Sequence, residues 1–164
     1  MEEVKLREAT ISDLDRIAKL AHLIWHQHYP AIIGLEQVEY MLDKMYSQDS
    51  LLEQMQIKKH RFFMIGLGNE EIGFVSVNQE DNENWFLNKF YIDQTKSPKG
   101  VGTLAFRQLI STIHPKKISL TVNRGNYKSI NFYFKLGFII EKTAVFDIGN
   151  NYVMDDFIMV WKKK

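Results

Sequence analysis

Residues 85–138 decide the fold; their sequence is WFLNKFYIDQTKSPKGVGTLAFRQLISTIHPKKISLTVNRGNYKSINFYFKLGF. The apolar run 85–92 predicts a strand, and the loop 97–103, which contains two glycines, predicts the start of a helix that ends before Pro115. A glycine-bearing loop between a strand and a helix presents backbone N–H groups at the positive end of the helix dipole. This arrangement favours a phosphate ligand, so the sequence predicts a phosphorylated cofactor.

Hydrophobic periodicity over the whole chain indicates a mixed α/β fold. A helix capped by Thr10 or Ser12 is expected to stop before Pro30, and Ser50 with Glu53 has the pattern of a capping box. The predicted strands are 4–9, 62–67, 72–77, 85–92, 117–122, 138–146 and 152–161, and the other predicted helices are 34–46, 50–58, 101–114 and 128–136. The expected fold is an α/β sheet of about seven strands, mostly antiparallel, with helices on both faces. Strands 85–92 and 117–122 form its parallel pair, because a crossover helix joins them.

The composition is that of one globular domain that spans residues 1–164. Hydrophobic residues make up 45% and charged residues 25% of the 164 residues. The net charge of +1 gives no electrostatic reason to expect nucleic acid or a membrane surface as a partner. The chain has no cysteine, no apolar run of membrane-spanning length and no signal-peptide pattern, so we expect a cytoplasmic protein.

Three kinds of phosphate-binding loop fit parts of the stretch. A nucleotide P-loop requires Lys-Ser/Thr directly after its second glycine, and the chain lacks that pair. The pattern Gly100-x-Gly102-x-x-Ala105 fits a dinucleotide loop, but residues 120–124 contain no ribose-binding carboxylate, although Arg124 would suit a 2′-phosphate. The third kind is a loop for coenzyme A.

Two segments resemble the GCN5-related N-acetyltransferase (GNAT) family. Ser97-x-x-Gly100-x-Gly102 after a strand resembles the family's pyrophosphate loop, and residues 120–138, LTVNRGNYKSINFYFKLGF, resemble its second core motif. The resemblance extends over essentially the whole chain. The family usually has Gln or Arg at the position of Ser97, so we expect Lys96 and Lys99 to supply charge, and the effect of Ser97 on coenzyme A affinity stays open.

The resemblance implies acetyl-CoA as cosubstrate and a set of cofactor contacts. The backbone of the strand ending at residue 92 would bind the pantetheine arm, and the loop and helix start would bind the diphosphate. Asn126 also fits the N-cap of the following helix. The implied contacts are Phe90, Tyr91, Ile92, Lys99, Gly100, Val101, Gly102, Thr103, Asn123, Asn126 and Tyr133.

Without cysteine, acetyl transfer is expected to be direct from acetyl-CoA to an amine. The resemblance makes Tyr133 the candidate acid for the leaving thiolate, because the ordinary tyrosine pKa near 10 keeps it protonated at pH 7. The alternative for Tyr133 is a packed aromatic on a helix face. A backbone N–H of Tyr91 or Ile92 is the resemblance-based donor to the thioester oxygen. The general base stays open among a water relay and His22, His26, His28, Glu80, Glu83, Asp155 and Asp156.

The predicted acceptor is a primary amine of a small molecule or a peptide. The carboxylates Glu36, Glu39 and Asp43 in helix 34–46 would attract a polyamine or another cationic amine, or they are simply solvated. The alternative function is a non-catalytic acyl-CoA-binding or sensing domain. We expect no metal, and the final strand pair could form a homodimer.

Overall fold

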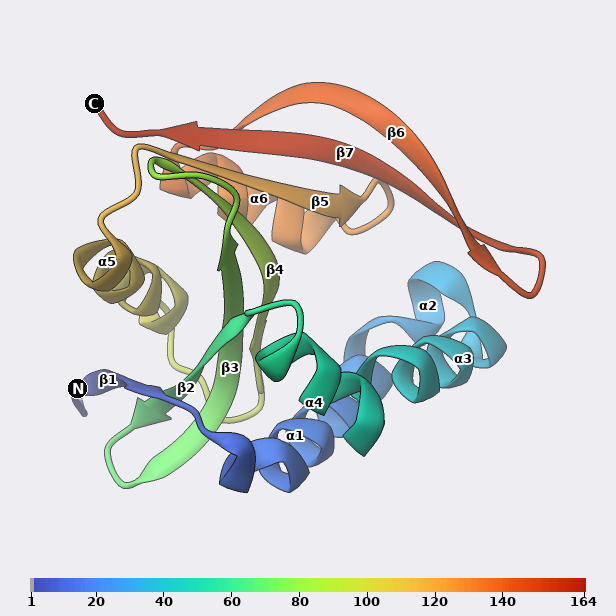
Figure 1. The fold of residues 1–164 in the computed structure, drawn as a ribbon, viewed down its shortest axis with the longest axis horizontal. Helices are drawn as coiled ribbons and strands as arrows, with labels where there is room; N and C mark the ends of the chain where they lie inside the picture. Colours follow the sequence, from blue (N-terminus) through green and yellow to red (C-terminus); the bar gives the residue numbers. More distant parts are fainter. Residues whose placement is uncertain (1) are drawn as a thin grey trace. The chain divides into compact units, whose positions relative to one another are not determined.

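The computed structural model describes residues 2–164 and contains seven strands and seven helical segments (Figure 1). The strands are β1 (Val4–Glu8), β2 (Arg61–Leu67), β3 (Glu70–Gln79), β4 (Asn84–Ile92), β5 (Lys117–Asn123), β6 (Ile139–Gly149) and β7 (Tyr152–Lys162). The helices are the 3₁₀ turn η1 (Ile11–Asp13), α1 (Leu14–His28), α2 (Pro30–Ile33), α3 (Leu35–Tyr46), α4 (Gln48–Gln56), α5 (Val101–Ile113) and α6 (Tyr127–Leu136).

The seven strands form one sheet in the order β1-β2-β3-β4-β5-β7-β6. The pairs β1–β2, β2–β3, β5–β7 and β6–β7 are antiparallel. Strands β4 and β5 are parallel, and their ladder joins Asn84–Phe86 to Lys117–Ser119. The expected α/β mixed sheet with one parallel β4–β5 pair is confirmed.

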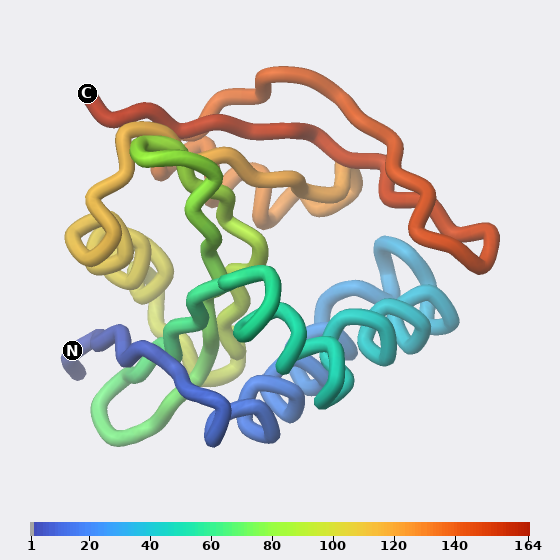
Figure 2. Tube along the Cα trace, viewed as in Figure 1, coloured from blue at the N-terminus to red at the C-terminus, as the bar shows by residue number. Residues whose placement is uncertain are grey.

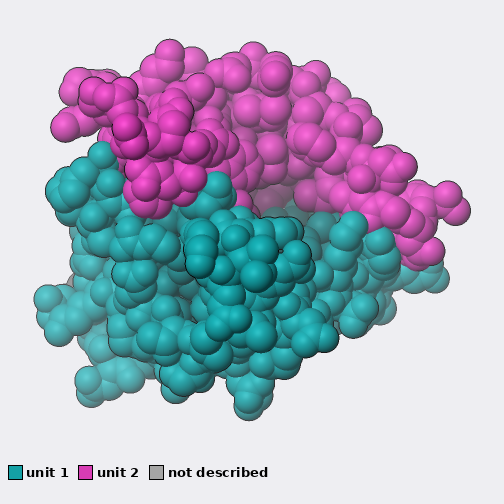
Figure 3. Space-filling view, viewed as in Figure 1, with its two compact units in different colours: residues 1–78, 89–114 teal, residues 79–88, 115–164 magenta. Residues whose placement is uncertain are grey.

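The chain divides into two compact units, which Figure 3 colours separately. Unit 1 contains residues 1–78 and 89–114, and unit 2 contains residues 79–88 and 115–164. The expectation that residues 1–164 form a single domain stays a prediction.

Unit 1 is built around strands β1, β2 and β3 and the second half of β4. Helices α1 and α4 lie on one face of these strands, and α5 lies on the other (Figure 1). The apolar positions of α1 and α3 recur at helical spacing, which places Ile17, Val38 and Leu42 in the core. The side chain of Gln108 in α5 bonds the backbone of β1 at both Val4 and Leu6, so it anchors this helix to the strand.

Unit 2 contains β5, β6, β7, α6 and the first half of β4. The side chains of Ile118, Leu120 and Met159 are completely or almost completely buried. Helix α6 ends at Gly137, whose φ of +103° is a left-handed conformation that suits glycine. Strands β6 and β7 form a long hairpin of eleven residues each (Figure 2), and most of β6 is exposed.

One local prediction in unit 1 is confirmed and another is wrong. Helix α1 ends at His28, before Pro30 as expected, and Pro30 then occupies the first position of the short helix α2, where its missing N–H costs nothing. Helix α4 begins at Gln48, two residues before the predicted capping box at Ser50, because the hydroxyl of Ser47 caps it by accepting a bond from the N–H of Ser50 at 3.2 Å.

Strand β3 approaches the end of β4 at a glycine. A methyl group built on Gly73 would overlap the carbonyl oxygen of Tyr91 and would lie 3.0 Å from the Cα atom of Ile92. Both of these atoms belong to the backbone, so they cannot move aside as a flexible side chain would. The conformation of β4 at residues 91–92 therefore requires glycine at position 73.

We predict that Gly73→Ala lowers the free energy of unfolding by about 2 kcal/mol or more, because overpacking against backbone has no cheap relaxation. Gly66→Ala is the matched control. Gly66 also lies in a strand of unit 1, but a methyl group there meets its nearest atom, the carbonyl oxygen of Lys5, at an ordinary 3.6 Å. Urea unfolding of both variants checks the prediction, and equal stability of the two would contradict it.

Candidate functional site

The loop after β4 is held by the side chain of Asp93. This carboxylate is buried and accepts bonds from the backbone N–H and the hydroxyl of Thr95, at 3.0 and 2.7 Å. The N–H of Asp93 in turn donates to the carbonyl of Ile72 in β3 at 2.8 Å. The start of the predicted phosphate loop is thus fixed to the sheet of unit 1.

Gly100 forms the N-cap of α5 with a φ of +96°. No atom lies within 4 Å of a methyl group built there, so the backbone conformation, rather than crowding, favours glycine. The N–H groups of Val101, Gly102 and Thr103 belong to the first turn of this 13-residue helix, where no carbonyl of the helix can accept them, and that of Val101 donates to the carbonyl of Pro98 at a long 3.4 Å. These amides and the exposed side chain of Lys99 can hold a diphosphate.

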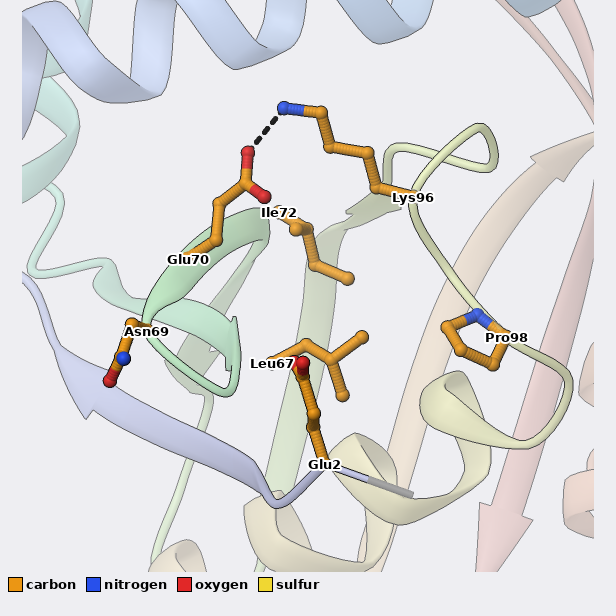
Figure 4. Close-up of a pocket in the computed structure, with 7 residues that line it drawn as sticks. All are labelled: Glu2, Leu67, Asn69, Glu70, Ile72, Lys96 and Pro98. Carbon is orange, nitrogen blue, oxygen red and sulfur yellow. Dashed lines mark hydrogen bonds and ion pairs between the residues drawn. The ribbon is translucent and has the colours of Figure 1, made fainter.

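The second lysine of the loop has another partner. Lys96 forms an ion pair with Glu70 of β3, and it lines a hollow of about 580 Å³ that Figure 4 shows. Glu2 and Glu70 also line this hollow, so its charge does not favour an anion. The prediction that Lys96 compensates for Ser97 is therefore not supported, and Lys99 is the better candidate.

The end of β4 lies against an aromatic cluster. The ring of Tyr91 is 5.8 Å from that of Trp25 and 5.7 Å from that of Phe74, and its hydroxyl is 3.3 Å from the hydroxyl of Tyr29. The predicted pantetheine segment, residues 90–92, is consequently packed against α1 and β3 within unit 1.

Sequence reasoning missed Lys89, which is almost fully buried in unit 1. Its ammonium donates to Gln54 Oε1 at 2.7 Å and lies over the rings of Tyr46 and Phe62, at 5.6 and 5.5 Å. Burial, with a smaller contribution from the charge of Lys58, lowers the pKa of Lys89 from 10.5 to about 7. Its position could have been found, because Lys89 follows Trp85 and Leu87 at the strand period of two.

In unit 2 the predicted asparagines support the backbone around the start of α6. Asn123 Oδ1 accepts from the N–H of Gly125 at 2.8 Å, and Asn126 Oδ1 accepts from the N–H of Ser129 at 3.3 Å. Asn126 is therefore the N-cap of α6. Its role as a cofactor contact, like that of Asn123, stays a prediction.

Tyr133 lies on the buried side of α6. Its ring packs against Phe132 and Phe138, with centroids 5.6 and 5.5 Å apart, and its carbonyl accepts from the N–H of Phe138 at 3.0 Å. The packing fixes the ring, which agrees with a positioned catalytic group and equally with a structural aromatic. The catalytic role stays a prediction.

Several predicted general bases are engaged in ion pairs within their unit. Glu83 pairs with Lys116, and Asp155 pairs with Arg124. His26 pairs with Glu39, and this bond raises the pKa of His26, with a further contribution from the carbonyl of His22. His22, His28 and Glu80 are exposed or half-buried, whereas Asp156 is buried.

Comparison with known proteins shows the family. The model of the acetyltransferase (GNAT) family matches residues 18–138, a range that includes the loop before α5 and the segment through α6. The chain therefore belongs to the GNAT family, and it is an acyltransferase.

Similar proteins span nearly the whole chain. Spermidine N(1)-acetyltransferase of Thermoplasma acidophilum is 24% identical over 159 residues, which cover 93% of this chain and 96% of that protein. The structure of PaiA N-acetyltransferase from Thermoplasma acidophilum in complex with coenzyme A matches with a TM-score of 0.78 and 24% identity, over 98% of this chain and 99% of that chain. Spermidine N-acetyltransferase from Vibrio cholerae in complex with CoA and spermine matches with a TM-score of 0.68 and 22% identity, over 97% and 95% of the two chains.

Two further findings apply to residues 2–164. No helix in this range is long and apolar enough to cross a membrane. The same range contains no group of three or more His, Asp or Glu side chains placed to hold a metal ion. The expectation that the protein uses no metal stays a prediction.

We predict that Gly100→Ala weakens acetyl-CoA binding about tenfold, because a side chain at this φ costs about 1–2 kcal/mol and displaces the first turn of α5. Gly137→Ala is the control, since Gly137 has nearly the same φ, +103°, at the end of another helix. Calorimetric titration with acetyl-CoA should show a higher Kd for Gly100→Ala and an unchanged Kd for Gly137→Ala. An equal loss of acetyl-CoA affinity in the two variants would contradict the prediction, because it would show that backbone strain anywhere in the fold has this effect.

The buried Lys89 predicts a pH dependence of stability. Its folded-state pKa of about 7 lies below the unfolded value near 10.5, so the unfolded state binds more protons between these values and stability rises with pH. Below pH 7 Lys89 is protonated in both the folded and the unfolded state, so the full cost of burying its charge lowers the stability.

We therefore expect the stability of Lys89→Met, relative to wild type, to fall as pH rises from 7 to 10, by at most about 1.4 kcal/mol per pH unit. Lys19→Met, at an exposed position of α1, is the control and should follow the wild-type pH dependence. Urea unfolding at several pH values measures both. A stability difference between Lys89→Met and wild type that is constant with pH would show that Lys89 has an ordinary pKa.

Proposed function

We propose that this protein transfers the acetyl group of acetyl-CoA directly to a primary amine, and that a cationic small molecule of the polyamine type is the acceptor. The observation that carries the proposal is the match to the GNAT family over residues 18–138, which contain both predicted coenzyme A motifs. The sequence has no cysteine, which leaves no thiol to carry the acetyl group on the enzyme.

The diphosphate of acetyl-CoA binds, in this proposal, at the start of α5. The amides of Val101, Gly102 and Thr103 donate to the phosphate oxygens, and Lys99 contributes a positive charge. The left-handed conformation of Gly100 supports this role, because it turns the chain directly into the helix. The Glu70–Lys96 ion pair argues that Lys96 does not take part.

The pantetheine arm binds along the backbone of Phe90, Tyr91 and Ile92, as the family resemblance implies. A backbone N–H of Tyr91 or Ile92 stabilises the thioester oxygen as negative charge develops on it. The packing of Tyr91 against Trp25 and Phe74 supports this assignment, since a fixed strand holds its donors in place without reorganisation.

Tyr133 acts in the proposal as the general acid. The amine nitrogen forms a bond to the acetyl carbon, the carbon–sulfur bond breaks, and the leaving thiolate takes the phenolic proton of Tyr133. A proton of the attacking amine leaves to a base, so that the products are the amide and free coenzyme A. Asn123 and Asn126 also contact the cofactor in this proposal.

The acceptor is proposed from the chemistry of α3 and from the relatives. Glu36 and Asp43 are exposed carboxylates on this helix, whereas Glu39 is paired with His26. The relatives named as spermidine acetyltransferases support a polyamine, at 24% and 22% identity. A peptide amine remains the second acceptor class in the test, and a homodimer through β6 and β7 is part of the proposal.

We predict that Tyr133→Phe lowers kcat about 100-fold, within the range for a general acid, while the Kd for acetyl-CoA stays unchanged. Tyr127→Phe is the control, because Tyr127 is a strongly exposed tyrosine on the same helix. Release of free coenzyme A is measured with spermidine, spermine, small monoamines and a peptide. An unchanged kcat in Tyr133→Phe would remove the residue from the mechanism, and wild-type protein without coenzyme A release from any amine would overturn the proposed function.

A further inference from the structure

Asp156 is a buried carboxylate that forms no ion pair within residues 2–164. It lies in β7, opposite Asn123 of β5 on one side and Ala144 of β6 on the other. Its side chain is almost completely inaccessible. The side chain of Thr121 in β5 interacts with it, but neither carboxylate oxygen has a partner at hydrogen-bond geometry within residues 2–164. Buried polar groups are nearly always bonded, so this carboxylate requires an explanation.

The neighbouring acid has a different environment. Asp155 is exposed and its carboxylate lies 3.5 Å from Arg124 Nη1, while its carbonyl accepts from the N–H of Arg124 at 3.0 Å. The guanidinium also lies 5.3 Å from the ring of Phe157. The guanidinium of Arg124 therefore interacts with Asp155 and Phe157, and it does not neutralise Asp156.

The charges around Asp156 in unit 2 do not stabilise its ionised form. Burial, followed by the negative charge of Asp155, raises the pKa of Asp156 to about 6, and the interaction of the Thr121 side chain with this carboxylate offsets only part of the shift. Lys142 of β6 is two residues from Ala144, the cross-strand partner of Asp156, but its side chain is exposed and no bond joins the two.

Folding alone does not account for a carboxylate at this position. An apolar residue would avoid the desolvation cost, whereas an unpaired buried carboxylate lowers stability. A cationic ligand would supply the missing partner. The position fits such a role, because Asp156 is opposite Asn123, and Asn123 is the last residue of β5, directly before the loop that leads to α6.

We infer that Asp156 binds the ammonium group of the acceptor and takes up its proton before the amine attacks the thioester. The nitrogen–hydrogen bond breaks, its electron pair stays on nitrogen, and the proton moves to a carboxylate oxygen of Asp156. The neutral amine then bonds to the acetyl carbon as the carbon–sulfur bond breaks, and the leaving thiolate takes the phenolic proton of Tyr133. The second proton of the nitrogen passes to the resulting tyrosinate, which leaves the amide, free coenzyme A and a protonated Asp156. This inference rests on the proposed function and assigns the base that the sequence left open among seven residues and a water relay.

The test compares Asp156→Asn with Asp155→Asn. Asparagine keeps the shape of aspartate but neither carries the charge nor accepts the proton. We expect kcat/KM for spermidine to fall about 100-fold or more in Asp156→Asn, within the range for general base catalysis, and to change less than threefold in Asp155→Asn. The Kd for acetyl-CoA should be retained in both variants. The thermal unfolding midpoint should fall in neither, and it should rise in Asp156→Asn because the buried charge is removed.

Two further readouts separate a base from a residue that only shapes the site. Hydroxylamine is largely unprotonated at pH 8, so it does not require a base before attack, and its turnover should be much less affected in Asp156→Asn than that of spermidine. In wild type, kcat/KM for spermidine should decrease as pH falls through about 6, as Asp156 becomes protonated. This acidic limb should be absent in Asp156→Asn.

A measurement without turnover completes the test. Carbon-13 NMR of the Asp156 carboxyl in wild-type protein should show its pKa falling when spermidine binds, because the ammonium stabilises the charged form. Wild-type kinetics in Asp156→Asn, equal losses with spermidine and hydroxylamine, or a carboxyl signal unaffected by spermidine would each overturn the assignment. Wild-type protein that releases no coenzyme A with any amine would overturn the proposed function itself.

Discussion

The close approach of β3 to β4 at Gly73 is the constraint on which unit 1 most depends. A side chain at that position would overlap the backbone of Tyr91 and Ile92. Along β4, buried and half-buried residues alternate as far as Lys89, and then Phe90 and Tyr91 are both half-buried, so the alternation changes phase where Gly73 approaches. The segment proposed to bind pantetheine is therefore positioned by backbone packing against β3, with the ring of Tyr91 held in the aromatic cluster.

Lys89 gives the same strand a second attachment. Its ammonium bonds Gln54 of α4, and Gln54 also donates to the carbonyl of Met45 at 2.7 Å, at the end of α3. A neutral amide acceptor and two aromatic rings compensate only part of the desolvation of an ammonium group, which is why its pKa falls toward 7. The contacts of Lys89 with Gln54, and of Gln54 with Met45, thus join β4 to the end of α3 and to α4. Burying the ammonium group lowers stability, and the surrounding apolar core must offset this cost.

The sequence predicts most of this fold because most of its elements have local causes. Periodicity places the seven strands, and the glycine loop places the start of α5 at Val101. Pro30 ends α1 as predicted, although it also begins the short helix α2, which is not predicted from the sequence. An error arises where two local signals compete, because Ser50 reads as a cap although Ser47 performs that role. The requirement for Gly73 and the burial of Lys89 depend on contacts with residues distant in the chain, which periodicity does not specify.

The adjacent acids of β7 show the same limit at the candidate site. In the sequence Asp155 and Asp156 are equivalent, and either could be solvated, paired or catalytic. In the structure, β7 lies between β5 and β6, and the two acids have different environments. Asp155 is exposed beside Arg124, whereas Asp156 is buried opposite Asn123. Because neighbouring residues of a strand point to opposite faces, this difference follows from register alone. The inference that Asp156 is the base therefore depends on the pairing of β5 with β7, which the sequence does not specify.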